Sequence, residues 1–382
     1  MAGAQAASGT AAPGLPAQSI QQSSRIESRI AALLDSVLAE SRAPGISLAV
    51  AWPDGRVLAL TAGFADSARG ERLSTAHSLM QGSVGKSYVA AVVMQLVEEG
   101  RLDVDAPISR WIGNEPWFAQ LPNASEVTLR MLLNHTSGIV RYEFDPEFTE
   151  DLTADPYRKW QPHEQIAYLF GDEPPFAAGE GWEYSDTNYI LVGLVIERVT
   201  GRKYVDELRD RLIVPLRLTA TFPVEGPVVP HLAQGYAGPG NPFGGADAML
   251  GADGRMTMDP SFEWTGGGVA STTADLARWA AALWGDGGRV VSDSSLNAMT
   301  TGVPARLGPN ARYGFGTIIR STSAGESFGH SGFFPGYVTD VMWFPDIRVA
   351  VAVQANASVR GALGMPAPEL LARVAQLASA GG

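Results

Sequence analysis

The segment QGSVGK, residues 81–86, contains a serine and a lysine at a spacing that suits covalent chemistry. If a helix begins here, Ser83 and Lys86 share one face and Ser83 lies at the positive end of the helix dipole. A serine hydroxyl loses its proton as it attacks a carbonyl, and a buried lysine with a lowered pKa can accept that proton. Arginine stays protonated, so it cannot replace the lysine. Lys86 is one of only three lysines in the chain, and the pair predicts a nucleophile with its proton partner.

The same residues also fit a plainer structure, in which Ser83 caps a helix and Lys86 lies on the surface. The motif is short enough to occur by chance, so the choice depends on the rest of the chain. There is no cysteine, and the Gly-x-Ser-x-Gly elbow of α/β-hydrolases is absent around Ser83 and Ser331. Three histidines have no partner at metal-ligand spacing: His77, His163 and His231. We therefore expect no metal and no cofactor.

The elements that must position this pair lie at both ends of the chain. Residues 1–24 carry no charge and predict a flexible tail, and a capping box at Ser24 predicts the start of a helix. Two apolar stretches around a Pro-Asp-Gly turn at 53–55 predict a β-hairpin. Residues 81–100 predict a helix that Gly100 closes. Four more strand-like segments lie between 313 and 356, ahead of a closing helix.

The middle of the chain is helical, with two long loops at 141–163 and 222–262. This pattern predicts an α/β (α+β) protein, with one antiparallel sheet flanked by the terminal helices and an inserted helical domain. The expected domains are residues 25–85 with 265–382 for the sheet and 86–264 for the insert. The seam between them is the expected place for a site.

Charge and composition narrow the function classes. The net charge is −12, and no basic patch is visible, so nucleic-acid binding is not expected. No apolar run approaches the roughly 18 residues of a membrane span. Residues 4–6 resemble the end of a secretory signal whose basic and apolar parts are missing. We expect a periplasmic or secreted protein, with a cytoplasmic location left open.

Several further segments accompany the serine and lysine in order along the chain. They are SVGKS at 83, LLNHTSGI at 132, YSDTNYILVG at 184, GGGVASTTADLARW at 266, YGFG at 313 and GHSG at 329. Together they resemble the class C β-lactamase and D-Ala-D-Ala carboxypeptidase family of penicillin-recognising serine hydrolases, which includes D-aminopeptidases and esterases. The resemblance runs from about residue 25 to the C-terminus and implies the β-lactamase/DD-peptidase-like fold.

The resemblance implies roles for particular residues. Ser83 would be the acylated nucleophile, Lys86 its proton partner and Tyr184 a second acid/base group that titrates with Lys86 as a pair. The segment His330-Ser331-Gly332 would lie on a strand that edges the cleft and pairs with a peptide-like substrate. The backbone N–H groups of Ser83 and Phe333 would form the oxyanion hole.

Two positions depart from the family pattern. Asp186 stands where the family has asparagine, so it can accept a hydrogen bond from Lys86 but cannot donate one to a substrate carbonyl. A close Asp186 would also raise the pKa of Tyr184 and of Lys86. Asn188 is a possible replacement donor in a shifted register. His330 stands where β-lactamases have lysine and holds a substrate carboxylate less firmly, which points away from an efficient β-lactamase.

Two groups of residues allow more than one interpretation. His135 is expected to be a helix-end histidine satisfied by local hydrogen bonds rather than a base. The acidic loop with Glu143 and Asp145 is expected to be solvated; the alternative is a cover whose carboxylates favour a substrate amine.

The resulting expectation is an acyl-enzyme serine hydrolase acting on D-amino-acid peptides, of the carboxypeptidase or aminopeptidase type. Ester hydrolysis, weak lactam hydrolysis and acyl transfer remain alternatives. A non-catalytic, penicillin-binding-like module is the alternative from another class. The expected partner is a small peptide, amide or ester, and the oligomeric state is left open.

Overall fold

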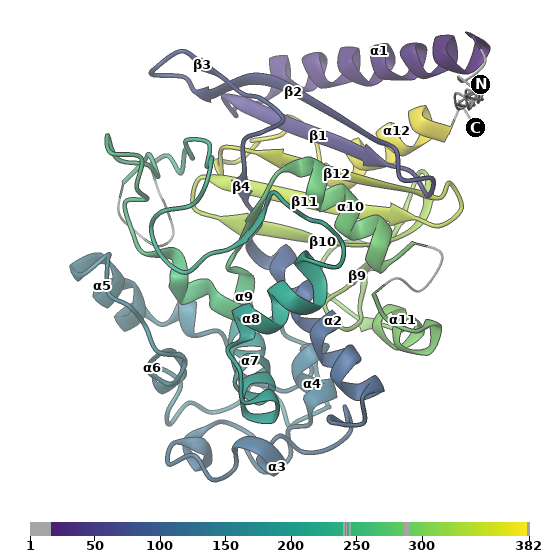
Figure 1. The fold of residues 1–382 in the computed structure, drawn as a ribbon. Helices are drawn as coiled ribbons and strands as arrows, with labels where there is room; N and C mark the ends of the chain where they lie inside the picture. Colours follow the sequence, from purple (N-terminus) through teal and green to yellow (C-terminus); the bar gives the residue numbers. More distant parts are fainter. Residues whose placement is uncertain (1–16, 240, 242, 244–245, 286–289, 380–382) are drawn as a thin grey trace, which may run out of the picture.

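A nine-stranded antiparallel sheet forms the centre of the upper half of the molecule (Figure 1). The computed structural model describes residues 17–239, 241, 243, 246–285 and 290–379. The strand order is β3-β2-β1-β12-β11-β10-β9-β8-β7, so the first and last strands of the chain pair at its middle. The expectation that both chain ends meet in one antiparallel sheet is confirmed.

The strands of this sheet are short at its edges and longer at its centre. Their bounds are β1 Gly45–Ala51, β2 Val57–Asp66, β3 Glu71–Arg72, β7 Val303–Pro304, β8 Arg312–Tyr313, β9 Ile318–Thr322, β10 Gly325–Phe334, β11 Tyr337–Phe344 and β12 Val349–Ala355. A smaller sheet, in the order β4-β6-β5, contains β4 Leu79–Met80, β5 Thr221–Pro223 and β6 Val269–Ser271. The hairpin expected around residues 53–55 is β1 and β2.

Helices cover both faces of the central strands, which explains why β1 and β12 are buried along their whole length. Leu48 and Val50 face the layer formed by α1 (Ala17–Glu40) and α12 (Ala367–Ser379). Ala49 and Ala51 face the opposite way, toward α10 (Thr273–Leu283), and their small side chains let this helix lie close to the sheet. Figure 1 shows α10 crossing the sheet on the side opposite α1.

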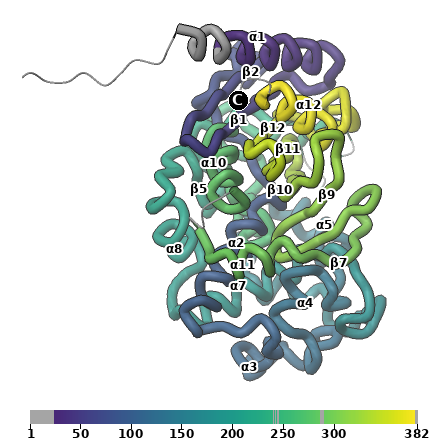
Figure 2. Tube along the Cα trace, turned by 90° about the vertical axis from the view of Figure 1, so that its right-hand side faces the viewer, coloured from purple at the N-terminus to yellow at the C-terminus, as the bar shows by residue number. Residues whose placement is uncertain are grey.

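The lower half of the molecule is built from short helices around α2 and α7 (Figures 1 and 2). Its helices and helical turns are η1 Gly82–Val84, α2 Gly85–Glu98, α3 Ser109–Ile112, η2 Phe118–Gln120, α4 Leu129–Leu133, η3 Tyr142–Phe144, α5 Pro146–Ala154, α6 Pro162–Ala167, α7 Asp186–Thr200, α8 Tyr204–Leu208, η4 Arg209–Ile213, η5 Pro260–Glu263 and α9 Trp264–Gly267. The remaining helix, α11 Asp293–Thr300, contacts α2. No helix in the described ranges is long and apolar enough to cross a membrane.

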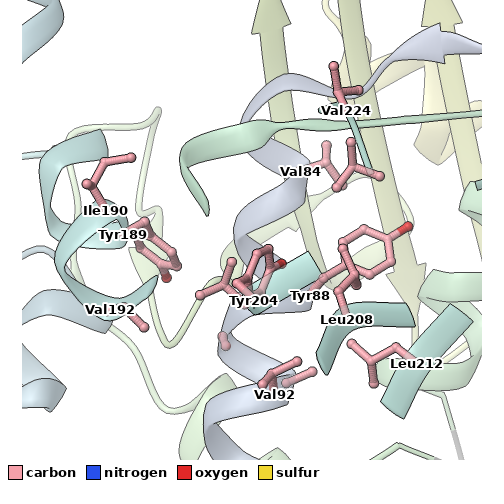
Figure 3. Close-up of a cluster of buried hydrophobic side chains, with 14 of the residues drawn as sticks. Val84, Tyr88, Val92, Tyr189, Ile190, Val192, Tyr204, Leu208, Leu212 and Val224 are labelled. Atoms are coloured by element: carbon pink, nitrogen blue, oxygen red, sulfur yellow. The ribbon is translucent and has the colours of Figure 1, made fainter. Parts of the chain in front are cut away.

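Helix α2 is held rigidly because it is packed on nearly every side. Figure 3 shows Val84 of η1 and Tyr88 and Val92 of α2 among side chains of α7 and α8. Tyr88 stacks on Trp279 of α10 at 4.0 Å between ring centroids, and the indole N–H of Trp279 donates to Ser87 at 2.9 Å. The segment that carries Ser83 and Lys86 is therefore anchored to α10, which packs on the sheet, as well as to α7 and α8.

Two sequence expectations about local structure need correction. Helix α1 begins at Ala17, before the capping box at Ser24, and residues 1–16 of the expected tail lie outside the described residues. The long loop at 141–163 contains η3, α5 and the start of α6, because Asp145 accepts a hydrogen bond from the Glu147 amide and caps α5. The acidic segment is thus partly helical and packed.

Candidate active site

The turn η1 brings Ser83 against strand β10. Gly82 has a φ of 53°, and a Cβ there would lie 2.3 Å from the Phe333 carbonyl oxygen. A Cβ on Gly332 would lie 1.8 Å from the Gln81 carbonyl oxygen and 3.3 Å from the Ser83 nitrogen. Glycine at both positions lets the two backbones approach, which places the Ser83 amide beside residues 332–333. This placement suits the expected oxyanion hole of Ser83 and Phe333, whose role stays a prediction.

Lys86 lies directly behind Ser83 and is fully buried. Its Nζ donates to Ser83 Oγ at 3.0 Å and also to the Gly266 carbonyl and the Asp186 carboxylate. Burial alone would lower the pKa of Lys86, but Asp186 and Tyr184 outweigh it and raise this pKa above its usual value. The expected lowering of the Lys86 pKa is therefore wrong, and the opposing effect expected of Asp186 prevails.

Tyr184, just ahead of α7, lies beside the same two residues. Its buried hydroxyl makes no hydrogen bond of ordinary geometry, and Lys86 Nζ lies 5.0 Å from its ring centroid. Burial raises the pKa of Tyr184, Lys86 lowers it and Asp186 raises it, with a net shift upward. At neutral pH Tyr184 is thus a phenol that can donate a proton.

Asp186 begins α7 and holds two cations. One carboxylate oxygen accepts from Lys86, as the sequence predicted, and the other lies 2.6 Å from Arg141 Nη2. Burial would raise the pKa of Asp186, but Arg141 and then Lys86 hold it below its usual value, so Asp186 is ionised. Arg141 was not expected at the site.

Asn188 does not replace the missing amide donor, so this expectation is wrong. Two residues along a helix amount to about 200° of rotation, which turns Asn188 away from the partners of Asp186. Its side chain is buried, accepts from Ser137 Oγ at 2.7 Å and lies 3.1 Å from His135 Nδ1. His135 Nδ1 also accepts from the Ser185 amide at 3.2 Å. The expectation that local hydrogen bonds satisfy His135 is confirmed for Nδ1 only, because its Nε2 is buried without a hydrogen-bond partner among the described residues.

On β10, His330 is a neutral part of the pocket wall. Its Nδ1 lies 2.6 Å from the Ser331 carbonyl oxygen, to which it donates, and its Nε2 accepts from the Tyr313 hydroxyl at 2.8 Å. Burial first, and then Lys86, lower the pKa of His330 to about 3. His330 therefore carries no charge near neutral pH, in line with the weak carboxylate binding expected of it. Ser331 turns its hydroxyl to Asp340 and Arg320 instead.

One pocket of about 460 Å³ lies between the sheet and the helices at this place. Its lining residues are Ser83, Arg141, Glu143, Phe144, Tyr184, Asp186, Phe243, Glu263, Leu307, Ile318, Arg320, His330, Ser331, Gly332 and Phe333. Seven of the eight predicted site residues are among them, and the eighth, Lys86, contacts Ser83 from behind the pocket wall. The solvated position expected for Glu143 is wrong, because its side chain is only 3% exposed. Asp145 is not in the lining and caps α5 instead.

Sequence reasoning missed Arg141, Glu263 and Arg320. None belongs to a spaced motif, and each reaches the pocket from a different segment of the chain. Their only sequence signal is the charge itself, close to the segments LLNHTSGI at 132, GGGV at 266 and GHSG at 329. Among the described residues, no group of His, Asp and Glu side chains could hold a metal ion.

The family model described as Beta-lactamase matches residues 30–376. Penicillin-binding protein 4* of Bacillus subtilis is 27% identical over 77% of this chain, and the chain spans 64% of the length of that relative. Esterase EstB of Burkholderia gladioli is 28% identical, with 89% of this chain and 92% of that protein covered. The structure of a D-stereospecific amidohydrolase from Streptomyces sp. is similar, with 30% identity, a TM-score of 0.73 and coverage of 87% and 94%.

The chain therefore belongs to the β-lactamase family, and it is a serine hydrolase. Its sheet with flanking helices is the fold of the β-lactamases and penicillin-binding proteins.

Proposed function

We propose that this protein hydrolyses amide bonds of short D-amino-acid substrates through an acyl-enzyme on Ser83. The contact of 3.0 Å between Ser83 Oγ, in the wall of a pocket, and the buried Lys86 Nζ is the observation that carries the proposal. The D-stereospecific amidohydrolase, at 30% identity, supports the choice of an amide of a D-residue.

In this mechanism Tyr184 is the group that moves the proton. Lys86 remains an ammonium, so the reactive form of the coupled pair is the one in which Tyr184 has lost its proton. The Tyr184 phenolate takes the proton from Ser83 as Oγ bonds to the substrate carbonyl carbon. Tyr184 then gives that proton to the leaving nitrogen, and the C–N bond breaks. Tyr184 next takes a proton from a water molecule as the water oxygen bonds to the acyl carbon. It returns this proton to Ser83 Oγ as the ester bond breaks, which releases the acid.

Strand β10 has two roles in this mechanism. The amides of Ser83 and Phe333 donate to the oxygen that becomes negative in the tetrahedral intermediate. The edge formed by residues 330–332 pairs with the substrate backbone as an added strand. Because His330 is neutral and both of its ring nitrogens already have partners, it supplies no charge that would hold a substrate carboxylate.

The test is covalent labelling followed by turnover. Wild type is incubated with an active-site fluorophosphonate and with a fluorescent penicillin, and intact mass is recorded. We expect one adduct, which Ser83→Ala loses and the exposed-serine control Ser294→Ala keeps. An adduct that persists in Ser83→Ala contradicts the proposal, and no adduct with either probe favours the non-catalytic module.

Ester hydrolysis is the second candidate, which the 28% identical esterase supports. Initial rates on D-alanine and L-alanine p-nitroanilides, a D-Ala-D-Ala peptide, p-nitrophenyl butyrate and nitrocefin separate these activities. Cleavage of the D-anilide well above the L-anilide supports the amidase. Turnover confined to the butyrate ester assigns the esterase instead.

A further inference from the structure

Carboxylates outnumber cations among the pocket residues that lie in or next to the helices and helical turns and the buried Lys86 behind them. Lys86, behind Ser83, and Arg141, in the pocket lining, both form ion pairs with the single carboxylate of Asp186. Glu143 and Glu263 line the same pocket. When both are ionised, three carboxylates face two cations, so one negative charge has no match among these five residues.

Glu143 is buried without a partner for one of its oxygens. Its side chain is 3% exposed, and its Oε2 makes no hydrogen bond. The nearest cation, Arg141 Nε, lies 3.8 Å from this oxygen, while the guanidinium lies closer to Asp186, at 2.6 Å. A buried carboxylate oxygen that lacks a donor is costly, and a ligand that donates to it removes that cost.

Glu263 lies on the same side, close to the turn of the nucleophile. It is 8% exposed, and in the described part of the chain the cations near it, Lys86 and Arg141, form ion pairs with Asp186 instead. A Cβ on Gly267 would lie 2.8 Å from Glu263 Oε2 and 2.7 Å from the Gly82 carbonyl carbon. The bare backbone of Gly267 thus makes room for this carboxylate next to the segment that carries Ser83.

From this geometry we propose that Glu143 and Glu263 form a subsite for a protonated amine on the acyl part of the substrate. One ammonium supplies the missing positive charge and donates to the unpartnered oxygen of Glu143. The subsite rests on the proposed function and narrows it: the preferred substrates are amides of amino acids or peptides with a free amino group. N-acylated substrates, whose nitrogen is neutral, leave both carboxylates unmatched.

Two alternative roles of these carboxylates would give different results. If Glu263 were instead a proton acceptor for water, its replacement by glutamine would lower kcat for every substrate and leave amine binding unchanged. If both carboxylates only supported the fold, their replacement would change stability and leave the ratio of amine-bearing to acylated ligands unchanged.

The experiment uses competition, so it does not require that the amide be cleaved. Hydrolysis of p-nitrophenyl butyrate is measured with D-alaninamide or N-acetyl-D-alaninamide as competitor, in wild type, Glu143→Gln, Glu263→Gln and the double variant. The exposed Glu150→Gln, with the same charge change, is the matched control. Wild type and the control should bind D-alaninamide more tightly than its acetylated form. In the double variant the inhibition constant for D-alaninamide should rise roughly 10- to 100-fold, with that of the acetylated form nearly unchanged.

Equal inhibition of wild type by the two amides overturns the subsite, and so does an unchanged ratio in the double variant. If the ester is not hydrolysed at Ser83, the proposed function fails separately. The same ligands are then compared by calorimetric titration, which reports amine binding without any turnover.

Discussion

The two sides of the pocket differ in how their charges are matched. On the strand wall, formed by β9 and β10, Arg320 Nη1 lies 3.7 Å from Asp340 Oδ1. Ser331 accepts from Arg320 at 2.7 Å and donates to Asp340 at 2.5 Å, and His330 is neutral. Arg320 and Asp340 thus balance each other's charge, and this wall is suited to fixing a substrate backbone.

The helical wall is defined here by four residues: Arg141, Glu143, Asp186 and Glu263. It has a surplus of carboxylates, and burial raises the pKa of Glu143 well above its usual value and that of Glu263 to about 7. Without a ligand these raised pKa values favour the neutral carboxyl groups, and a cationic ligand would favour their ionised form. The difference supports the proposal that residues on opposite sides of Ser83 position the substrate backbone and select the charge of the substrate.

The largest effect is expected from breaking the centre of the helical wall. Asp186→Ala leaves Lys86 and Arg141 buried without their common carboxylate, and loss of one partner of a buried ion pair costs about 3–5 kcal/mol. Urea unfolding at pH 7 should show a drop of this size. The exposed Asp293→Ala is the control, and a drop below about 1 kcal/mol in Asp186→Ala would contradict the buried network.

In the strand wall, an added side-chain atom should lower stability and activity more than a change of charge does. Gly332→Ala introduces a Cβ where the Gln81 carbonyl oxygen lies 1.8 Å away, so β10 or η1 must move. We expect a loss of about 1–3 kcal/mol in stability and, as the oxyanion amides shift, a fall in kcat of about 10²-fold or more. Unfolding and ester turnover measure the two effects. Gly226→Ala, where a Cβ meets open space, should change neither.

The pH dependence of the free energy of unfolding reports the raised pKa of Glu263. Its pKa is near 4.3 in the unfolded chain and about 7 in the folded protein, because burial and then Asp186 disfavour its charge. Between these values the folded state keeps a proton that the unfolded state has lost. Glu263 therefore makes wild-type stability fall as pH rises from about 4.5 to 7, by up to about 1.4 kcal/mol per pH unit.

Glu263→Gln has no proton to lose, so its stability relative to wild type should rise over the same window. Urea unfolding at several pH values measures this slope difference. Glu150→Gln, exposed on α5, should follow wild type throughout. Parallel curves for wild type and Glu263→Gln would mean that the carboxyl is solvated in the folded protein.

Much of the strand wall could be predicted from the sequence, and less of the helical wall. Ser83 and Lys86 share a helix start, so local spacing was enough to predict that their side chains lie on one face. The position of GHSG at the edge of the cleft was predicted from the resemblance to the family. Arg141 and Glu263 reach the site from segments far apart in the chain, and no period relates them. Their positions depend on how η3 and η5 pack, which is a property of the tertiary structure.

Asp186, which stands where the family has asparagine, also shows that contacts between distant segments are not predictable from the sequence. The sequence predicted that it would accept from Lys86 and raise the pKa of its neighbours, since these effects follow from the carboxylate alone. It did not predict that Arg141 would hold the second oxygen. The alternative donor Asn188 failed because the direction of a helical side chain is determined by its position in the turn.

Asp186→Asn, which introduces the residue usual in the family, tests what the extra charge does to catalysis. Asp186 raises the pKa of both Lys86 and Tyr184, and the proposed mechanism requires that Tyr184 lose its proton. The rise of kcat/KM with pH should therefore lie in the alkaline range in wild type. In Asp186→Asn the carboxylate is gone while Arg141 keeps its charge, so this rise should move to lower pH, by roughly one unit. Background-corrected ester hydrolysis from about pH 6 to 11 measures the shift, with Asp293→Asn as control, and a rise that stays in place or moves upward would exclude Tyr184 as the base.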